Sequence, residues 1–191
     1  DRERRTKGEW LEQARTCLAQ GNASGATRAA REAVNLDRAD AECWQVLGAA
    51  AALEHRFDDA EEALTEALRL QPDHMNTRLR LAEVYLGERK WRPAIAEFER
   101  VLAERPGDPA ARAGLGEAYL HTGQTNEGLA LLRAVVTENP DDSDLERVLA
   151  FALYQQAMDG LAELPEGKVA LSARQVSLLR RNVAEIRGLG L

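Results

Sequence analysis

A repeat of 34 residues runs through most of this chain. Three prolines, Pro72, Pro106 and Pro140, stand at this interval, and the residues between them keep the same step. A fixed period of this length is typical of a chain built from one small structural unit that is copied and stacked. A single copy cannot bury its apolar face, so neighbouring copies must complete its core. The matching positions are Leu47, Leu81 and Leu115; Gly48, Ala82 and Gly116; Ala60, Ala94 and Gly128; and Leu64, Phe98 and Leu132.

Each copy predicts two helices joined by a short turn. In the second copy, Trp44, Leu47 and Ala51 recur at helical spacing and mark the apolar stripe of a first helix. The acidic run Asp58–Glu61 predicts the N-cap and first turn of a second helix. Pro72 ends that helix, because proline cannot continue it. Phased in this way, the copies are 7–40, 41–74, 75–108 and 109–142, with a partial fifth copy at 143–156.

The period fails at both ends of the chain. Arg38 stands where the later copies have proline, so the first copy is degenerate. After residue 156 no second helix follows on schedule, and Asp159–Gly160 predicts an irregular linker over 157–171. Ser172–Gln175 reads as a capping box that opens a final helix. We expect this helix, over 172–191, to cap the array, since terminal units are often atypical.

The pattern resembles the tetratricopeptide repeat, whose consensus carries Trp, Leu-Gly, Tyr, Ala, Phe, Ala and Pro at these offsets. The resemblance covers residues 7–156. It implies an all-α, right-handed superhelical solenoid of helix-turn-helix repeats with a C-terminal capping helix. It further implies a non-catalytic scaffold that binds a peptide or partner protein in a concave groove lined by the first helices. Tryptophan is not kept at its consensus position, so we expect that this position is not filled in the same way in every unit. The residues there are Trp10, Trp44, Arg78, Arg112 and Glu146.

Helical geometry identifies the groove positions. Each residue of a helix advances about 100°, so the residues that the core stripe leaves unused share a second face. Small residues at Ala49, Ala52 and Ala113 predict the floor of the groove. Apolar and aromatic side chains flank this floor, and Glu83 and Glu117 add acids. Such a surface suits an extended or helical peptide with apolar side chains and a basic residue. The candidate partner-binding residues are Asn76, Leu79, Arg80, Glu83, Leu86, Ala113, Glu117, His121, Arg147, Phe151 and Tyr154.

Several alternatives stay open at this point. Phe151 and Tyr154 either face a partner or pack beneath the final helix. The final helix has an apolar stripe and nearby arginines, so it caps the array, pairs with a second copy of the chain or docks on an anionic surface. Self-association into a homo-oligomer is therefore the alternative function. Because the chain opens on Asp1 without Met, we also consider it a segment of a longer protein, as the regulatory or targeting arm of a multidomain enzyme.

Composition argues against other classes of function. The net charge is -7, which disfavours nucleic-acid binding, although the flank at 1–6 is basic. No apolar run is long enough to span a membrane. No metal-ligand spacing, nucleophile elbow or phosphate loop occurs, so we predict no enzyme, no catalytic residue, no cofactor and no metal.

Two further observations concern the compartment of the protein and the kind of partner that it binds. Cys17 and Cys43 fall on apolar helical faces and read as buried reduced thiols, which favours a reducing compartment such as the cytoplasm. Relatives that capture a C-terminal carboxylate use a clamp of basic and amide side chains on the groove face. Of the residues at the corresponding positions, only Arg80 has a basic side chain placed for this role, so we expect that clamp to be absent.

Overall fold

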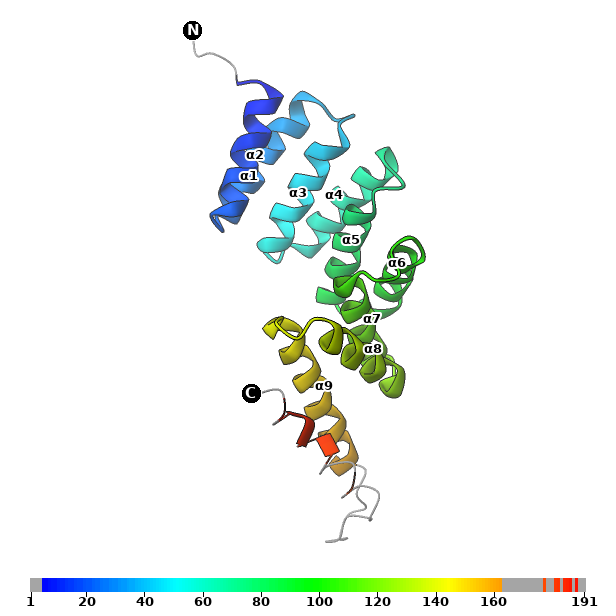
Figure 1. Cartoon of the computed structure of the whole chain (residues 1–191). Coiled ribbons are helices and arrows are strands. Elements are labelled where there is room, and N and C mark those ends of the chain that lie inside the picture. Colours follow the sequence, from blue (N-terminus) through cyan, green and yellow to red (C-terminus); the bar gives the residue numbers. More distant parts are fainter. Residues whose placement is uncertain (1–4, 163–176, 178–180, 183, 187, 189–191) are drawn as a thin grey trace. The chain divides into compact units, whose positions relative to one another are not determined.

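The computed structural model describes residues 5–162, 177, 181–182, 184–186 and 188, and all elements among them are helices (Figure 1). The predicted all-α fold is therefore confirmed. The chain divides into two compact units, 1–106 (unit 1) and 107–191 (unit 2). Unit 1 contains α1 (Lys7–Ala19), α2 (Ala23–Leu36), α3 (Ala41–Leu53), α4 (Phe57–Leu70), α5 (Met75–Gly87) and α6 (Trp91–Glu104). Unit 2 contains α7 (Pro109–His121), α8 (Thr125–Glu138) and α9 (Ser143–Ala162).

The helices keep the period of the sequence. The first helix of each pair begins 34 residues after the one before it, at Lys7, Ala41, Met75, Pro109 and Ser143. The second helices keep the same step, at Ala23, Phe57, Trp91 and Thr125. These first-helix starts are the residues at which the phased copies begin.

Within each unit the helices pack in chain order. In unit 1, every helix contacts the next one, and the first helix α3 also contacts the first helices α1 and α5 on either side of it. The second helices of this unit make no such contact among the described residues. In unit 2, α7 packs against both α8 and α9. In unit 1 the first helices therefore lie closer together than the second helices.

The core lies between the paired helices. Leu64 and Phe98, one repeat apart, are both fully buried on second helices. Across from Leu64, the first helix has Gly48, where an added Cβ would lie 2.6 Å from the Leu64 Cγ. Glycine or alanine recurs at this crossing because a larger side chain would push the two helices apart.

The helix starts differ between the two members of a pair. Most first helices have a side-chain N-cap at one repeat position; the Asp40 carboxylate, for example, accepts the Glu42 N–H at 2.9 Å. The second helices α4, α6 and α8 have no side-chain cap hydrogen bond. The predicted cap at Asp58 is wrong, because α4 begins at Phe57 and Asp58 lies in its first turn. There the carboxylates favour the positive end of the helix dipole.

Each pair turns at a residue with positive φ. Gly21 and Gly123 occupy this position in the first and fourth turns, and His55 (φ 55°) and Arg89 (φ 60°) occupy it in the second and third. A side chain with a Cβ is strained there, whereas glycine is not. Nothing lies within 4 Å of a Cβ added at Gly21 or Gly123, so only the backbone conformation favours glycine.

We predict that Arg89→Gly raises the free energy of unfolding by about 1 kcal/mol, because it relieves the left-handed backbone strain. Urea unfolding of the full chain measures this change. The reciprocal variant Gly123→Ala should lower the same quantity by about as much. A destabilised Arg89→Gly protein would show that the side chain contributes more than the strain removes.

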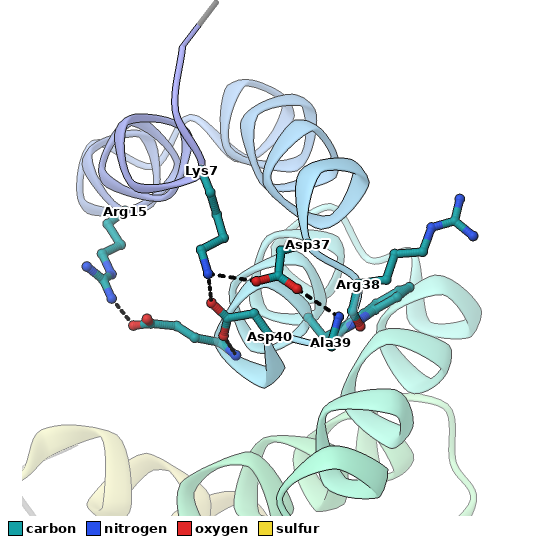
Figure 2. Close-up of polar contacts among 8 residues, drawn as sticks. Lys7, Arg15, Asp37, Arg38, Ala39 and Asp40 are labelled. Atoms are coloured by element: carbon teal, nitrogen blue, oxygen red, sulfur yellow. Dashed lines mark hydrogen bonds and ion pairs between the residues drawn. The ribbon is translucent and has the colours of Figure 1, made fainter.

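The turn that lacks proline is held by charged side chains instead. Figure 2 shows Lys7 donating to both Asp37 (2.9 Å) and Asp40 (2.7 Å) in the loop before α3. The Asp37 carboxylate also accepts the Ala39 N–H at 3.1 Å. Hydrogen bonding to Asp40 and Asp37 raises the pKa of Lys7. These contacts fix a loop in which Arg38 replaces the proline of the later copies.

The residue at the tryptophan position differs between repeats, but in two repeats its side chain donates to the same loop carbonyl. The Trp44 Nε1 donates to the Arg38 carbonyl at 2.8 Å, and Arg78 donates to the equivalent Pro72 carbonyl at 2.7 Å. Arg78 also forms an ion pair with Glu97 of α6 at 2.7 Å. The prediction that the position is filled differently is correct for the side chains, but the loop carbonyl is satisfied in the same way in both repeats.

The C-terminal end departs from the predicted boundaries. Helix α9 runs to Ala162, so the start of the segment expected to be irregular, 157–162, is helical and Asp159–Gly160 does not break it. The rest of the predicted linker and much of the predicted capping helix, with any self-association through it, lie outside the described residues.

The described residues of that final segment contact α8 and α9. The Asn182 amide donates to the Leu153 carbonyl (3.2 Å) and to Gln156 (2.9 Å). Glu185 forms a bidentate ion pair with Arg133 of α8, with its shortest N···O distance at 2.7 Å. Ile186 packs against the core of unit 2. These contacts tie the described part of the segment to unit 2.

The two cysteines are free thiols. Cys43 on α3 is fully buried in a core cluster with residues of α1 and α2, and burial raises its pKa to about 11. Cys17 is only half-buried. Both sulfurs therefore lie on helices as expected, but only Cys43 belongs to the core.

Candidate functional site: the α7–α9 cleft

A cleft of about 530 Å³ opens between α7 and α9 in unit 2. Four of the predicted groove residues line it: Glu117 and His121 from α7, and Arg147 and Phe151 from α9. We call it the α7–α9 cleft. Its remaining lining residues are Leu120, Thr125, Asp144, Val148, Ala152, Gln155 and Gln156.

The spacing on α9 explains how its side chains are shared between core and cleft. Leu149 and Leu153, four residues apart, are buried in the core of unit 2. Phe151 lies between them in sequence and is therefore turned away, with 56% of its surface exposed. Tyr154 is likewise 52% exposed. The alternative that both residues pack beneath the final helix stays a prediction, because most of that segment lies outside the described residues.

Glu117 contributes a partly buried carboxyl group to the lining of the cleft. Burial raises the pKa of this carboxyl, and the nearby His121 only partly opposes the shift. Within the described part of the chain, no arginine or lysine forms an ion pair with Glu117. By contrast, Arg147 at the mouth of the cleft pairs with Asp144, one turn earlier on α9, at 2.5 Å. The cleft thus contains an ionisable carboxylate that the protein itself leaves without a cationic partner among its described arginines and lysines.

We predict that Glu117→Gln raises the free energy of unfolding at neutral pH. A carboxyl whose pKa is higher in the folded chain favours folding fully only below its unfolded value, 4.5, and this contribution is lost as the pH rises through the folded pKa. The advantage of glutamine should therefore shrink as the pH falls toward 4.5. Urea unfolding at several pH values measures this. An equal difference at every pH would contradict the burial of the carboxylate.

The equivalent surface of unit 1 is much smaller. A cavity of about 100 Å³ lies between α3 and α5, and Arg80 and Glu83 line it together with Ala49 and Ala52, the predicted small-residue floor. Phe57 from α4 is also part of the lining. The small residues therefore do not produce a deep groove here.

The structure places the other candidates elsewhere. Asn76 accepts a hydrogen bond from Arg105 at 2.6 Å, and Leu79 and Leu86 are half-buried on α5 without lining a described cavity. Ala113 is buried in the core of unit 2 rather than exposed on the groove floor. Tyr154 is exposed on α9 but does not line the cleft.

Sequence reasoning missed several residues that line the cleft. Val148 and Ala152 are one helical turn apart on α9 and lie on the side that faces α7. The selection of one outward face per helix excluded them, because they lie between that face and the core. Their apolar character at i, i+4 spacing was the available signal.

Two other kinds of site find no support in the described part of the chain. Among these residues, no group of histidines, cysteines and carboxylates could hold a metal ion. None of the helices described is both long enough and apolar enough to cross a membrane.

Comparison with solved structures supports the fold. The structure is similar to MamA (residues 41 to the end) from Desulfovibrio magneticus RS-1, with a TM-score of 0.76, 20% identity and coverage of 96% of this chain and 94% of that one. It is also similar to TTC0263, a thermophilic TPR protein of Thermus thermophilus, with a TM-score of 0.65, 25% identity and coverage of 78% and 82%. The similarity to MamA, at 20% sequence identity, shows a shared fold and nothing more.

Sequence relatives are much longer proteins. Tetratricopeptide repeat protein 21B of Homo sapiens is 26% identical over 169 residues, which is 87% of this chain and 13% of that protein. Superkiller complex protein 3 of Homo sapiens is 26% identical over 114 residues, 60% of this chain and 7% of that protein. The chain thus spans about a tenth of their length. The family model described as "Tetratricopeptide repeat" matches residues 51–96 and 86–152, more than half of the chain. This chain belongs to the tetratricopeptide repeat family.

Proposed function

We propose that the chain is a non-catalytic scaffold that binds a segment of a partner protein in the α7–α9 cleft. Repeat proteins of this kind use the surface formed by their stacked units to bind partners, so the family supports an interaction role. The observation that carries the proposal is the cleft itself, which Phe151, Glu117 and Val148 line together. Its volume of about 530 Å³ suits a few side chains of a bound segment.

Phe151 is the side chain that should contribute most to binding. It is aromatic and 56% exposed, and it is rigidly held on a helix whose neighbouring residues form the core. Aromatic anchors of this kind are over-represented among the interface residues whose truncation weakens binding most. A partner that covers this ring would remove a large apolar surface from water.

The test is a selection of binding peptides from a random display library on the full chain, followed by titration of the selected peptides. Phe151→Ala should weaken their binding by about thirtyfold or more, which is the effect of losing a major anchor. Leu36→Ala is the matched control, because Leu36 is also 56% exposed but lies on α2 of unit 1. A library that yields no binders, or equal affinity for Phe151→Ala and wild type, would overturn the proposal.

A further inference from the structure

We infer that the segment bound by the α7–α9 cleft carries one lysine or arginine flanked by apolar side chains, and that Glu117 selects the basic residue. This inference rests on the proposed function and adds the chemical class of the ligand. It follows from the charges that line the cleft, from the apolar surface beside it and from the distribution of exposed apolar residues in the described chain.

The first observation is the balance of charge. Of the charged side chains that line the cleft, Asp144 and Arg147 neutralise each other at the mouth, where both are mostly exposed (77% and 68%). Glu117 lies deeper, half-buried on α7, with His121 one turn away. A cation brought by a ligand would therefore meet a carboxylate that is partly removed from water and that no described arginine or lysine pairs with. An acidic ligand would meet repulsion from the same group.

The second observation is the apolar surface of α9. Phe151, Tyr154 and Met158 are 56%, 52% and 43% exposed, at i, i+3 and i+7 spacing along the helix. Among the described residues only two other large apolar side chains, Leu36 and Leu53, are exposed to this degree, and both lie in unit 1. A run of this kind marks an interaction surface rather than a scattered set of surface residues.

Together, the charge balance and the apolar stripe favour a ligand that combines apolar side chains with one basic residue. The stripe from Phe151 to Met158 is about 10 Å long, which matches about three residues of an extended segment or two turns of a helix. Leu120 and Val148 add apolar walls next to Glu117. Phe151 belongs to the stripe and also lines the cleft together with Glu117, so a segment that covers Phe151 would bring a neighbouring basic residue toward Glu117. Charge-assisted pairing at this carboxylate should favour the basic residue over a neutral one by about ten- to hundredfold.

The test repeats the peptide selection with wild-type protein and with Glu117→Lys. Wild-type protein should select peptides that have lysine or arginine beside apolar residues, whereas Glu117→Lys should select aspartate or glutamate at that position. In a selected peptide, replacing the basic residue by norleucine should weaken binding to wild type by about ten- to hundredfold. The same replacement should change binding to Glu117→Gln by less than about threefold, because the partner charge is gone.

The results of these experiments distinguish a wrong ligand class from a wrong binding site. Selected peptides without a basic residue, or a norleucine effect that is equal in wild type and Glu117→Gln, would overturn the inference. If Phe151→Ala still abolishes binding in that case, the cleft remains the binding site and only the ligand class is wrong. Misfolding does not confound the comparison, because Glu117→Gln is expected to be at least as stable as wild type, and urea unfolding checks this directly.

Discussion

Phe98→Ala should lower the free energy of unfolding of the chain by about 3–5 kcal/mol. Phe98 is the largest fully buried side chain described, and it stands on α6 at the repeat position that Leu64 and Leu132 occupy in the neighbouring copies. Removing the ring deletes its contacts and leaves a cavity between α5 and α6. Urea unfolding followed by circular dichroism measures the change.

Phe98→Leu is the matched control, because leucine is the residue that the repeat itself has at Leu64 and Leu132. We expect this variant to lose about 1.5 kcal/mol or less, since most of the volume is kept. Equal losses for alanine and leucine would mean that the aromatic shape, rather than the volume that it fills, holds α6 in place.

Gly128→Ala should destabilise unit 2 by about 2–3 kcal/mol. In most helices the same substitution is stabilising, because alanine is the better helix former. Here an added Cβ would lie 2.6 Å from the Gly116 carbonyl oxygen and 3.2 Å from Leu120. The obstacle at 2.6 Å is backbone of α7, so it cannot turn aside as a flexible side chain would. Helices α7 and α8 would have to separate.

Gly8→Ala provides the matched control for this prediction. Gly8 lies in the first turn of α1, and its added Cβ would approach only the Thr6 hydroxyl, at 4.0 Å. We expect Gly8→Ala to be neutral or to raise the free energy of unfolding by up to about 1 kcal/mol. Stabilisation by both substitutions would contradict the close crossing of α7 and α8.

The repeat made most of the fold predictable. The interval of 34 residues determined where helices begin, because each copy repeats the same apolar stripe and the same helix stop. The predicted helix boundaries were wrong where the repeat pattern ends. Helix α9 continues past Gly160, because one glycine inside a helix costs only about 1 kcal/mol relative to alanine and does not by itself end the helix. The prediction of an N-cap at Asp58 was wrong because acidic residues are favourable in the first turn of a helix as well as at the cap position.

The candidate site was predictable only in part. Helical phase correctly directed Glu117 and Phe151 to one surface, because that depends on spacing alone. It did not foresee that Ala113 would be buried. The sequence also did not predict the size of the cavities, which is about 100 Å³ in unit 1, where Phe57 is part of the lining, and about 530 Å³ in unit 2. Cavity size depends on which side chains of neighbouring helices meet, and the repeat pattern does not specify this.

The most direct test of the central claim is methyl NMR of the full chain, labelled at leucine and valine, during titration with a selected peptide. Binding in the α7–α9 cleft predicts shifts of the Leu120 and Val148 methyl signals, which line it. The exposed methyls of Leu36 and Leu53 in unit 1 should stay unchanged. Shifts at Leu36 or Leu53 with none at Leu120 and Val148 would contradict the account.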